Sequence, residues 1–408
     1  MAIPTTTVEI GFDLTGLGGP FFLLDDPVAG VLDNTEFLLG GTLFVDVTAY
    51  VRNVSVQRGK SRQLDKFTAG VTSVEFNNNL RTFDPENTAS PFYGQVIPKR
   101  NIRVKTDGSA VFYGVVDDWN LKYDISGLST ASADCVDGFT YLAQNALSSG
   151  TATSQLTGAR INAILDRSEV NWSSATRSID TGSQLLQADF IADATNALEY
   201  LQLVSSSENG AIFIGADGSF IFNDSNVAAV SAGQVLFADD GSGVPFSEIQ
   251  VVYGSELLYN YVQIERLSGG TALAQDTDSI STYGQQALVR TGLLLDTDDQ
   301  ATQLAGYLLG QFSEPEYRFE TLSVQLEAIS SAEQIDVLGL EIGDVCQVKF
   351  TPNQIGTQIN KYAVIIKIEH DIQPQAHRVR FGFETLDYAS LVLDDVEFGI
   401  LNTNQLGL

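Results

Sequence analysis

The stretch Val111–Tyr123, with the sequence VFYGVVDDWNLKY, decides the fold class. Apolar and polar residues alternate along its second half, which places Trp119, Leu121 and Tyr123 on one face of a long strand. Further alternating runs precede and follow it, so a period of two extends over residues 42–137. Because the side chains of a strand point alternately to its two faces, this series predicts a β-barrel or a β-sandwich.

The segment that follows, residues 138–240, predicts a small α+β module. A hairpin is expected from Ile212–Ile214 and Phe220–Phe222, turned by Asp217-Gly218, because this dipeptide suits the positive φ angles of a two-residue turn. Before the hairpin, apolar residues recur at helical spacing. They are Phe139, Leu142 and Ala146, then Ile161, Ile164 and Leu165, then Phe190, Ala194, Ala197, Leu198 and Leu201.

Residues 241–395 predict a second β unit with an inserted helix. The helix is expected near Asp298–Phe312, because Thr297 and Gln300 form a capping box, and its buried stripe is Leu304, Leu308 and Phe312. The polar segment Ser268–Tyr283 predicts a long loop.

The two ends of the chain are predicted to lie outside these units. Residues 1–41 predict an arm or a loosely packed entry strand, and residues 396–408 predict an extended tail. The fold class is therefore α+β and mainly β.

The two β units show signs of an internal repeat. In the first unit the short strand Arg103–Lys105 leads into the long strand and a return strand follows; in the second, Gln347–Phe350 leads into Tyr362–Ile372 and Arg378–Phe383 returns. Tyr113 and Val115 align with Tyr362 and Val364, and Trp119, Leu121 and Tyr123 align with Ile368, His370 and Ile372. Alternation alone makes any two β-hairpins look alike, so duplication and coincidence both fit this pattern.

The charge is strongly acidic because basic residues are few. The chain of 408 residues carries 51 acidic and 22 basic side chains, which gives a net charge of −29. Such a charge argues against stable binding to nucleic acid or to an anionic membrane surface. No run of 18 apolar residues predicts a membrane span, and the N-terminus shows no signal peptide.

The basic residues concentrate in one segment. Residues 51–105 hold ten basic and four acidic side chains, a local charge of +6, so the remainder carries −35. This basic island predicts contacts with other copies of the chain or with acidic neighbours, although a solvated strand face explains it equally well. The candidate interface residues are Arg58, Arg62, Lys66, Lys99, Arg100, Arg103 and Lys105.

The sequence offers no motif for enzymatic chemistry, a cofactor or a metal. Gly59-Lys60-Ser61 has the end of a phosphate-binding loop, but the glycine required five residues earlier is Val54. Cys135 and Cys346 lie among apolar residues and predict buried free thiols.

The two histidines also lack a catalytic pattern. His370, between Ile368 and Ile372, predicts a core or interface histidine, and His377 lies at a turn near Pro374. A dyad of His370 with Cys346 is conceivable in space without a local signature.

The acidic clusters leave two other interpretations. Asp276–Asp278 and Asp296–Asp299 lack the glycine and distal glutamate of a calcium loop, and a helix start explains the second cluster better. Carboxylate pairs keep glycoside hydrolysis open as the enzymatic alternative.

Several unusual sequence pieces follow one another in the stretch 46–143. They are DVTAYV at Asp46–Val51, RGKSRQLD at Arg58–Asp65, FNN at Phe76–Asn78, RTFDP at Arg81–Pro85, SPFYG at Ser90–Gly94, IPKR at Ile97–Arg100 and FYGVVDDW at Phe112–Trp119. With them the chain resembles minor tail proteins of the baseplate or tail-tip hub of siphophages, a family common in phages of actinobacteria and their relatives. Leu340–Val345 (LEIGDV) is similar to the L-x-x-G-D turn of hub proteins.

This resemblance implies a structural protein of the virion, located at the tail tip and assembled in the host cytoplasm. In such hubs three subunits form a ring that closes the tail tube. Each subunit supplies two tube-like β-barrels, so a homotrimer presents a pseudo-sixfold ring to a sixfold tube. The implied partners are further copies of the chain, the distal tail protein, the tape-measure protein and other tip proteins.

The resemblance also implies a mechanical role in DNA delivery. A hub opens to let DNA through, and we expect an acidic lumen to repel the phosphates. Longer hub proteins often carry a C-terminal peptidase or fibre region; this chain stops at Leu408, so no appended enzyme is expected. The alternatives are a hexameric distal tail ring protein, a tip-associated cell-wall hydrolase and a carbohydrate-binding receptor module.

Overall fold

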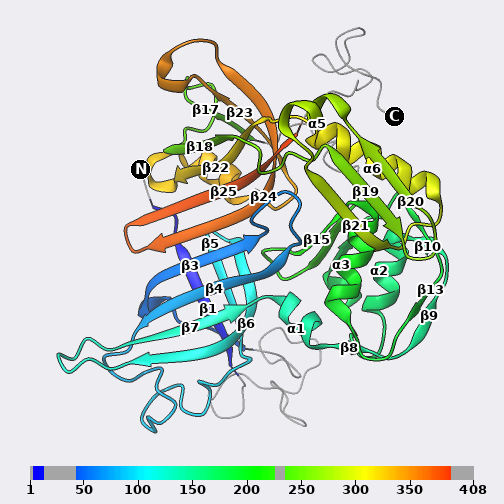
Figure 1. Ribbon diagram of the computed structural model, residues 1–408. Coiled ribbons are helices and arrows are strands. Elements are labelled where there is room, and N and C mark those ends of the chain that lie inside the picture. Colours follow the sequence, from blue (N-terminus) through cyan, green and yellow to red (C-terminus); the bar gives the residue numbers. More distant parts are fainter. Residues whose placement is uncertain (1–2, 13–42, 226–234, 387–408) are drawn as a thin grey trace.

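A large, mainly antiparallel β-sheet runs through the molecule. The computed structural model describes residues 3–12, 43–225 and 235–386. Thirteen strands belong to this sheet, which contains two groups of strands, here called the first and the second β unit. In Figure 1 the second β unit lies above the first, and helices α2 and α3 lie beside them on the right. None of the helices in the described part of the chain is long and apolar enough to span a membrane.

The first β unit contains seven strands around its own hydrophobic core. Phe76, Phe83 and Trp119 stack in that core, with ring centroids 4.4 to 6.1 Å apart. The strands are β1 (Thr6–Phe12), β2 (Leu43–Asp46), β3 (Val51–Gly59), β4 (Thr68–Asn77), β5 (Asn101–Thr106), β6 (Ser109–Lys122) and β7 (Thr130–Val136), and a short 3-10 turn, Thr48–Tyr50, precedes β3.

The described part of the predicted N-terminal arm is a strand, as one of the two alternatives expected, but it packs tightly rather than loosely. β1 pairs with both β5 and β2, and Val8, Ile10 and Phe12 are completely buried. Three apolar side chains at alternate positions explain why this strand packs into the core rather than loosely on it. The rest of that predicted arm, residues 13–42, lies outside the described residues.

The second β unit contains six strands. They are β17 (Val235–Ala238), β18 (Glu248–Tyr253), β22 (Tyr317–Gln325), β23 (Val345–Phe350), β24 (Ile359–Gln373) and β25 (Ala376–Leu386). A 3-10 turn, Leu326–Ala328, and helix α7 (Ser331–Leu338) connect β22 to β23, and a second 3-10 turn, Pro352–Gln354, precedes β24. The predicted C-terminal tail, residues 396–408, lies outside the described residues.

The two β units repeat the same order of strands. The first follows β3-β4-β7-β6-β5-β1, and the second follows β18-β22-β25-β24-β23-β17. Arg103 lies opposite Tyr113 as Gln347 lies opposite Tyr362, and a β-bulge interrupts β6 after Val116 as it interrupts β24 after Ile365. The alignment proposed from sequence therefore corresponds to equivalent positions in space.

The turns before the short strands β5 and β23 repeat in the same detail. Lys99 and Gly343 both have positive φ angles, of 65° and 94°. Lys99 N–H donates to Val116 O at 2.6 Å, and Gly343 N–H donates to Ile365 O at 2.8 Å. The last strand differs, because β1 is antiparallel to β5 whereas β17 is parallel to β23. Among the described residues the strand pairings do not close either unit into the predicted tube-like barrel.

Residues 138–225 form the helical module between the two units. Its helices are α1 (Gly138–Gln144), α2 (Thr157–Leu165) and α3 (Ala197–Glu208), with a 3-10 turn at Ser174–Thr176. Its strands are β8 (Ala146–Leu147), β9 (Gly150–Ala152), β10 (Gln155–Leu156), β11 (Arg177–Ile179), β12 (Leu185–Leu186), β13 (Asp189–Ile191), β14 (Thr195–Asn196), β15 (Ala211–Ile214) and β16 (Phe220–Asn223). The module and the second β unit share one hydrophobic core.

Two details of the predicted module are wrong. The apolar stripe begins too early, because Phe190 lies in a strand and is 67% exposed, and Ala194 has a φ of 61°. The helix starts only after Asn196, whose side chain accepts the Glu199 N–H. The hairpin exists, but its loop is longer than two residues, since Gly215 N–H donates to Ser219 O and only Gly218 has positive φ.

Residues 255–313 form an inserted module between β18 and β22. It contains a small sheet of β19 (Tyr261–Arg266), β20 (Thr271–Gln275) and β21 (Ala287–Leu293), with helices α5 (Thr277–Tyr283) and α6 (Asp298–Phe312). The predicted α6 and its capping box are confirmed. The predicted long loop is wrong, because β20 and α5 occupy it. Ala301 and Ala305, rather than Leu304, complete the buried stripe of α6.

Candidate functional site at the joint between the two β units

Strands β3 and β24 join the two β units into one sheet. They pair antiparallel, from Gly59 opposite Lys367 to Val54 opposite Ile372. β24 makes this possible by changing partners along its length, because its first half pairs with β23 and its second half with β3. The change of partner coincides with the bulge after Ile365. A bulge bends and twists a strand, so it redirects β24 toward the first unit.

Gly59 allows the two strands to approach closely at this point. Its φ is 109°, and a Cβ at this position would lie 2.2 Å from Ile366 O. The next residue, Lys60, donates its backbone N–H to the same oxygen at 3.0 Å. Only glycine fits both the backbone angle and the short distance.

An ion pair behind the joint connects three parts of the molecule. Arg58 on β3 is 4% exposed, and its Nη1 lies 2.8 Å from Glu341 Oε1 of the turn before β23. The same nitrogen approaches Ile214 O of the helical module at 3.4 Å, and Ala216 N–H donates to Glu341 Oε2 at 2.8 Å. A buried charge without its partner is costly, so this pair favours one arrangement of the three parts.

Asp137 supports the same region from the start of α1. Its carboxylate caps the helix by accepting the Phe139 N–H at 2.9 Å and also accepts the Gly70 N–H of β4 at 2.6 Å. Burial raises the pKa of Asp137 to about 7, although both hydrogen bonds and the nearby Arg58 act in the opposite direction. The side chain is thus a polar link between the first β unit and the helical module.

Two buried histidines lie on the core side of the joint. His370 Nδ1 and His377 Nε2 are 3.0 Å apart, and both residues are at most 6% exposed. Burial lowers the pKa of His370 well below its usual range and that of His377 to about 4. The proximity of Arg58 also lowers the pKa of His370, whereas Glu327, Asp371 and Asp107 raise that of His377 without offsetting its burial.

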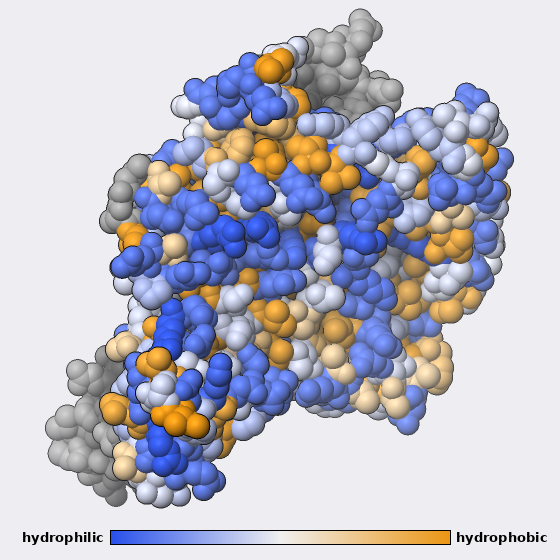
Figure 2. Space-filling model, turned by 60° about the vertical axis from the view of Figure 1, so that its left-hand side comes forward, coloured by the Kyte–Doolittle hydropathy of each residue, from blue (hydrophilic) through white to orange (hydrophobic). Residues whose placement is uncertain are grey.

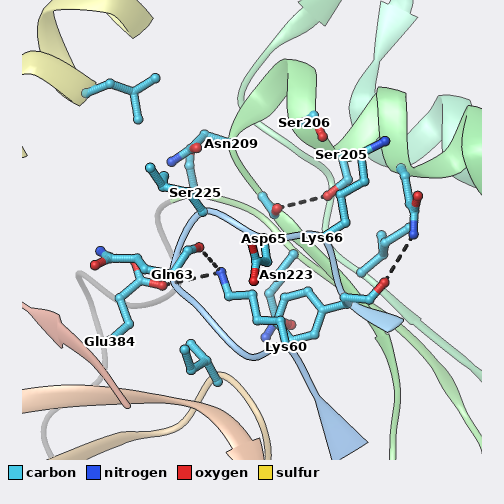
Figure 3. Close-up of a pocket in the computed structure, with 18 of the residues that line it drawn as sticks. Lys60, Gln63, Asp65, Lys66, Ser205, Ser206, Asn209, Asn223, Ser225 and Glu384 are labelled. Atoms are coloured by element: carbon cyan, nitrogen blue, oxygen red, sulfur yellow. Dashed lines mark hydrogen bonds and ion pairs between the residues drawn. The ribbon is translucent and has the colours of Figure 1, made fainter. Parts of the chain in front are cut away.

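A cavity of about 510 Å³ lies beside the joint, where both β units, the helical module and the inserted module meet. Figure 3 shows its polar wall, where Lys60 contacts the Gln63 carbonyl and Glu384, the latter at 3.4 Å. Gln63 also donates to Glu384 at 2.8 Å, and Lys60 lies over the Phe67 ring at 5.1 Å. Lys60, Gln63 and Glu384 therefore bond to one another in this wall.

The joint offers structure rather than a reactive group. Gly59-Lys60-Ser61 is the end of a strand and not a phosphate loop. His370 is hydrogen-bonded to His377, and burial raises the pKa of the Cys346 thiol, which disfavours the thiolate. Among the described residues no three His, Cys, Asp or Glu side chains gather as metal ligands. Asp276 caps helix α5.

The structure does not gather the predicted basic island into one surface. Arg58 is internal, as described above. Arg103 and Lys105 share Glu9 of β1, at 2.5 and 3.7 Å. Arg100 donates to Gln95 Oε1 at 2.8 Å. These four side chains bind partners within the chain.

The other three basic residues are more accessible. Arg62 pairs with Glu256 at 3.0 Å, and both side chains are more than half exposed. Lys99 contacts Asp117 with half of its side chain exposed. Lys66 is exposed at the wall of the cavity.

The sequence reasoning missed Glu341 and Asp137 as members of the joint. Asp137 carried a usable signal, since an aspartate directly before an apolar helical stripe is a typical N-cap. No sequence signal pointed to Glu341, because its partner Arg58 is 283 positions away in the sequence.

Comparisons with known proteins identify the architecture. No protein-family model matches the sequence, and no curated protein matches it. Among solved structures, a 43 kDa tail protein of prophage MuSo2 from Shewanella oneidensis has a TM-score of 0.56 at 14% identity, covering 84% of this chain and 95% of that one. The tail protein from Neisseria meningitidis MC58 has a TM-score of 0.59 at 10% identity, covering 95% and 97%.

The chain has the fold of these tail proteins. The resemblance to phage tail proteins inferred from residues 46–143 is therefore confirmed at the level of the fold. The match covers nearly the whole length of both relatives, so both β units and the material between them take part in it.

Proposed function

We propose that this protein is a structural subunit of the tail tip of a tailed phage, a baseplate hub that closes the tail tube and adapts it to the tip proteins. The repeated strand order carries this proposal. A chain with two equivalent β units presents six units when three copies form a ring, which fits a sixfold tube. The partners would be further copies of the chain, the distal tail protein, the tape-measure protein and other tip proteins.

We further propose that one face of the joined sheet lines the channel. Across the joint, Asp134, Ser73, Ser55, Asp371 and Arg378 lie in one row over five neighbouring strands. They share the face opposite the buried core residues. Figure 2 shows hydrophilic residues predominating across the middle of this side of the molecule.

The charges on that face suit a passage for DNA. Arg378 and Arg380 lie beside Asp371 and Glu369, at 3.4 and 3.7 Å. Since acidic neighbours neutralise these arginines, they offer little net positive charge to retain phosphates. The chain as a whole carries −29, which adds repulsion.

Of the basic island, we propose that Arg62, Lys66 and Lys99 contact other subunits. These three residues are exposed, whereas Arg58 is buried and Arg100, Arg103 and Lys105 are partly buried.

Labelling intact virions with an antibody against this chain tests the proposal. We expect gold particles at the distal end of the tail, in virions assembled in the host cytoplasm. Label along the tube or on the capsid would contradict it. A zymogram on host peptidoglycan tests the hydrolase alternative, and a clear band that one carboxylate substitution abolishes would replace the structural role with an enzymatic one.

A further inference from the structure

Strand edges remain open at more than one place in the described part of the sheet. β2 and β18 are its two outermost strands, and each pairs with one neighbour only, β2 with β1 and β18 with β22. The second half of β6, from Asp118 to Lys122, pairs with β7 on one side, whereas β5 on the other side ends opposite Val115. In the described part of the chain, the free edges of β18 and of this half of β6 have no main-chain partner. Unpaired strand edges are ready to add another strand.

The pairing of β3 with β24 within the chain, here called the closed joint, shows which strand each open edge could bind. By the repeat, β6 is equivalent to β24, and β18 is equivalent to β3, since Val54 lies opposite Val74 as Ile249 lies opposite Leu322. In the closed joint, the half of β24 beyond its bulge pairs with β3. In the described part of the chain, the corresponding half of β6 and the whole of β18 lack such a partner.

We propose that β6 of one copy pairs antiparallel with β18 of the next copy, in the register of the closed joint. This deepens the proposed function, because it names the surface through which the ring forms. The closed joint sets His370 opposite Val56, and the equivalent positions are Leu121 and Val251. It sets Ile372 opposite Val54, and the equivalents are Tyr123 and Ile249. The contact is head-to-tail, so it generates a closed ring if the rotation between copies permits.

The exposure of the side chains supports this pairing. In the closed joint Val54 and Ile372 are only 1% and 7% exposed. At the open edges Tyr123 and Tyr253 are 53% and 68% exposed. In the proposed register Tyr253 lies opposite Trp119, on the face that also carries Leu121 and Tyr123. The ring contact would bury an aromatic stripe, and aromatic side chains are enriched at protein interfaces.

A second glycine supports the same register. Gly254 follows β18 at the position equivalent to Gly59, where the closed joint needs a glycine next to Ile366 O. Among the described residues of the single chain, a Cβ on Gly254 would meet only Val252 Cγ1, at 3.9 Å. The fold of the single chain therefore gives no steric reason for this glycine, whereas the proposed contact with Asp117 O of the next copy does.

Two residues of the basic island flank the proposed contact. Lys99 pairs with Asp117, which lies at the bulge of β6. Arg62 pairs with Glu256, two residues beyond Gly254. Both ion pairs are exposed, so they are available to exchange partners between copies.

Disulfide trapping in the full-length chain tests the register. Leu121→Cys together with Val251→Cys places two thiols opposite each other across the proposed contact, within the distance that a disulfide spans. The native cysteines are buried and leave the background low. The control is Leu121→Cys with Gln250→Cys, whose side chains point to opposite faces of the sheet.

We expect the matched pair to give cross-linked chains, up to a closed species of three copies, at least tenfold more than the control. Equal cross-linking of both pairs, or none over a concentration series, would overturn the proposed register. Success here with antibody label away from the tail tip would leave the edge pairing intact and refute only the tail-tip role. Failure of the cross-linking together with label at the tail tip would refute the edge pairing and leave the tail-tip role intact.

A substitution at the second glycine provides an independent test. Gly254→Val, added to the matched cysteine pair, should reduce cross-linking at least tenfold while the melting temperature of the single chain stays unchanged. Gly306→Ala in α6 serves as the control, because a Cβ there also meets open space. Undiminished cross-linking with Gly254→Val would contradict the close approach of β6 to β18.

Discussion

The closed joint and the open edges are two versions of the same strand contact. At the closed joint, β3 and β24 bury small and medium side chains behind the sheet, together with Arg58 and the two histidines. At the open edges, β6 and β18 carry exposed tyrosines at the equivalent positions. A repeat that satisfies one contact within the chain and leaves its counterpart unpaired is incomplete as a monomer. The difference between them thus indicates which surface another copy covers.

The largest effect is expected from breaking the closed joint at its ion pair. Glu341→Ala leaves Arg58 buried without a carboxylate, and removing one partner of a buried pair typically costs about 3–5 kcal/mol. Urea denaturation followed by tryptophan fluorescence measures the change in the free energy of unfolding. Trp119 reports on the first β unit, and Trp172 reports on the helical module. A loss below about 1 kcal/mol would show that the pair does not hold the three parts together.

The next effect concerns pH and arises at the closed joint, where His370 stands in place of Leu121. Because the folded pKa values of His370 and His377 are depressed, to about 4 for His377, the unfolded chain binds protons that the folded chain excludes. The contribution of the two histidines to stability is therefore fully present above pH about 6.5 and is lost as the pH drops toward 4, by about 3 kcal/mol for His377.

Asp137 partly masks this effect, because its pKa is raised to about 7 and its contribution to stability grows as the pH falls from 7. Asp137→Asn should therefore lose more stability than the native chain between pH 7 and pH 5 in urea denaturation. Adding His377→Asn should remove the part of that slope that His377 contributes, while His370 keeps its own part. An unchanged slope in that double variant would mean that His377 does not titrate in this range.

A smaller effect separates the two glycines. Gly59→Ala should destabilise the chain by about 2 kcal/mol or more, because alanine is strained at a φ of 109° and meets Ile366 O. Gly254→Ala should change the stability of the single chain by less than about 0.5 kcal/mol. Thermal unfolding of both variants checks this contrast, and equal losses would mean that the two positions do not differ as the repeat implies.

The smallest effect is expected at the edge of the open contact. Lys99→Ala removes an exposed ion pair with Asp117, which contributes at most about 0.5 kcal/mol to folding. We expect no measurable change in the melting temperature, together with weaker cross-linking of the Leu121 and Val251 cysteine pair. A marked loss of stability would place Lys99 in the fold rather than at a subunit contact.

Local signals predicted much of the fold. The capping box at Thr297 located α6 because its hydrogen bonds lie within a few residues. The alternation along Val111–Tyr123 predicted β6. Its alignment with Tyr362–Ile372 left duplication and coincidence open, and the strand order shows the duplication. Where the pattern was weak the prediction was wrong, as in α5, whose side chains are mostly exposed and polar, and in the short strand β20, which buries none of its side chains fully.

The site was harder to predict, because it depends on contacts between distant residues. Arg58 was predicted to be a subunit-interface residue. In the structure it is buried and forms an ion pair with Glu341, which lies far along the chain. The same applies to His370, whose partner His377 follows only after the strand reverses. Sequence alternation indicates which face a residue occupies, but only the pairing of strands shows what lies opposite it.

A single-particle reconstruction of the assembled ring, refined without imposed symmetry, tests the central claim most directly. The account predicts three copies of the 44.0 kDa chain, about 132 kDa in all, with Leu121 of each copy opposite Val251 of the next. Six copies in the ring, or three copies with β18 facing solvent, would contradict it.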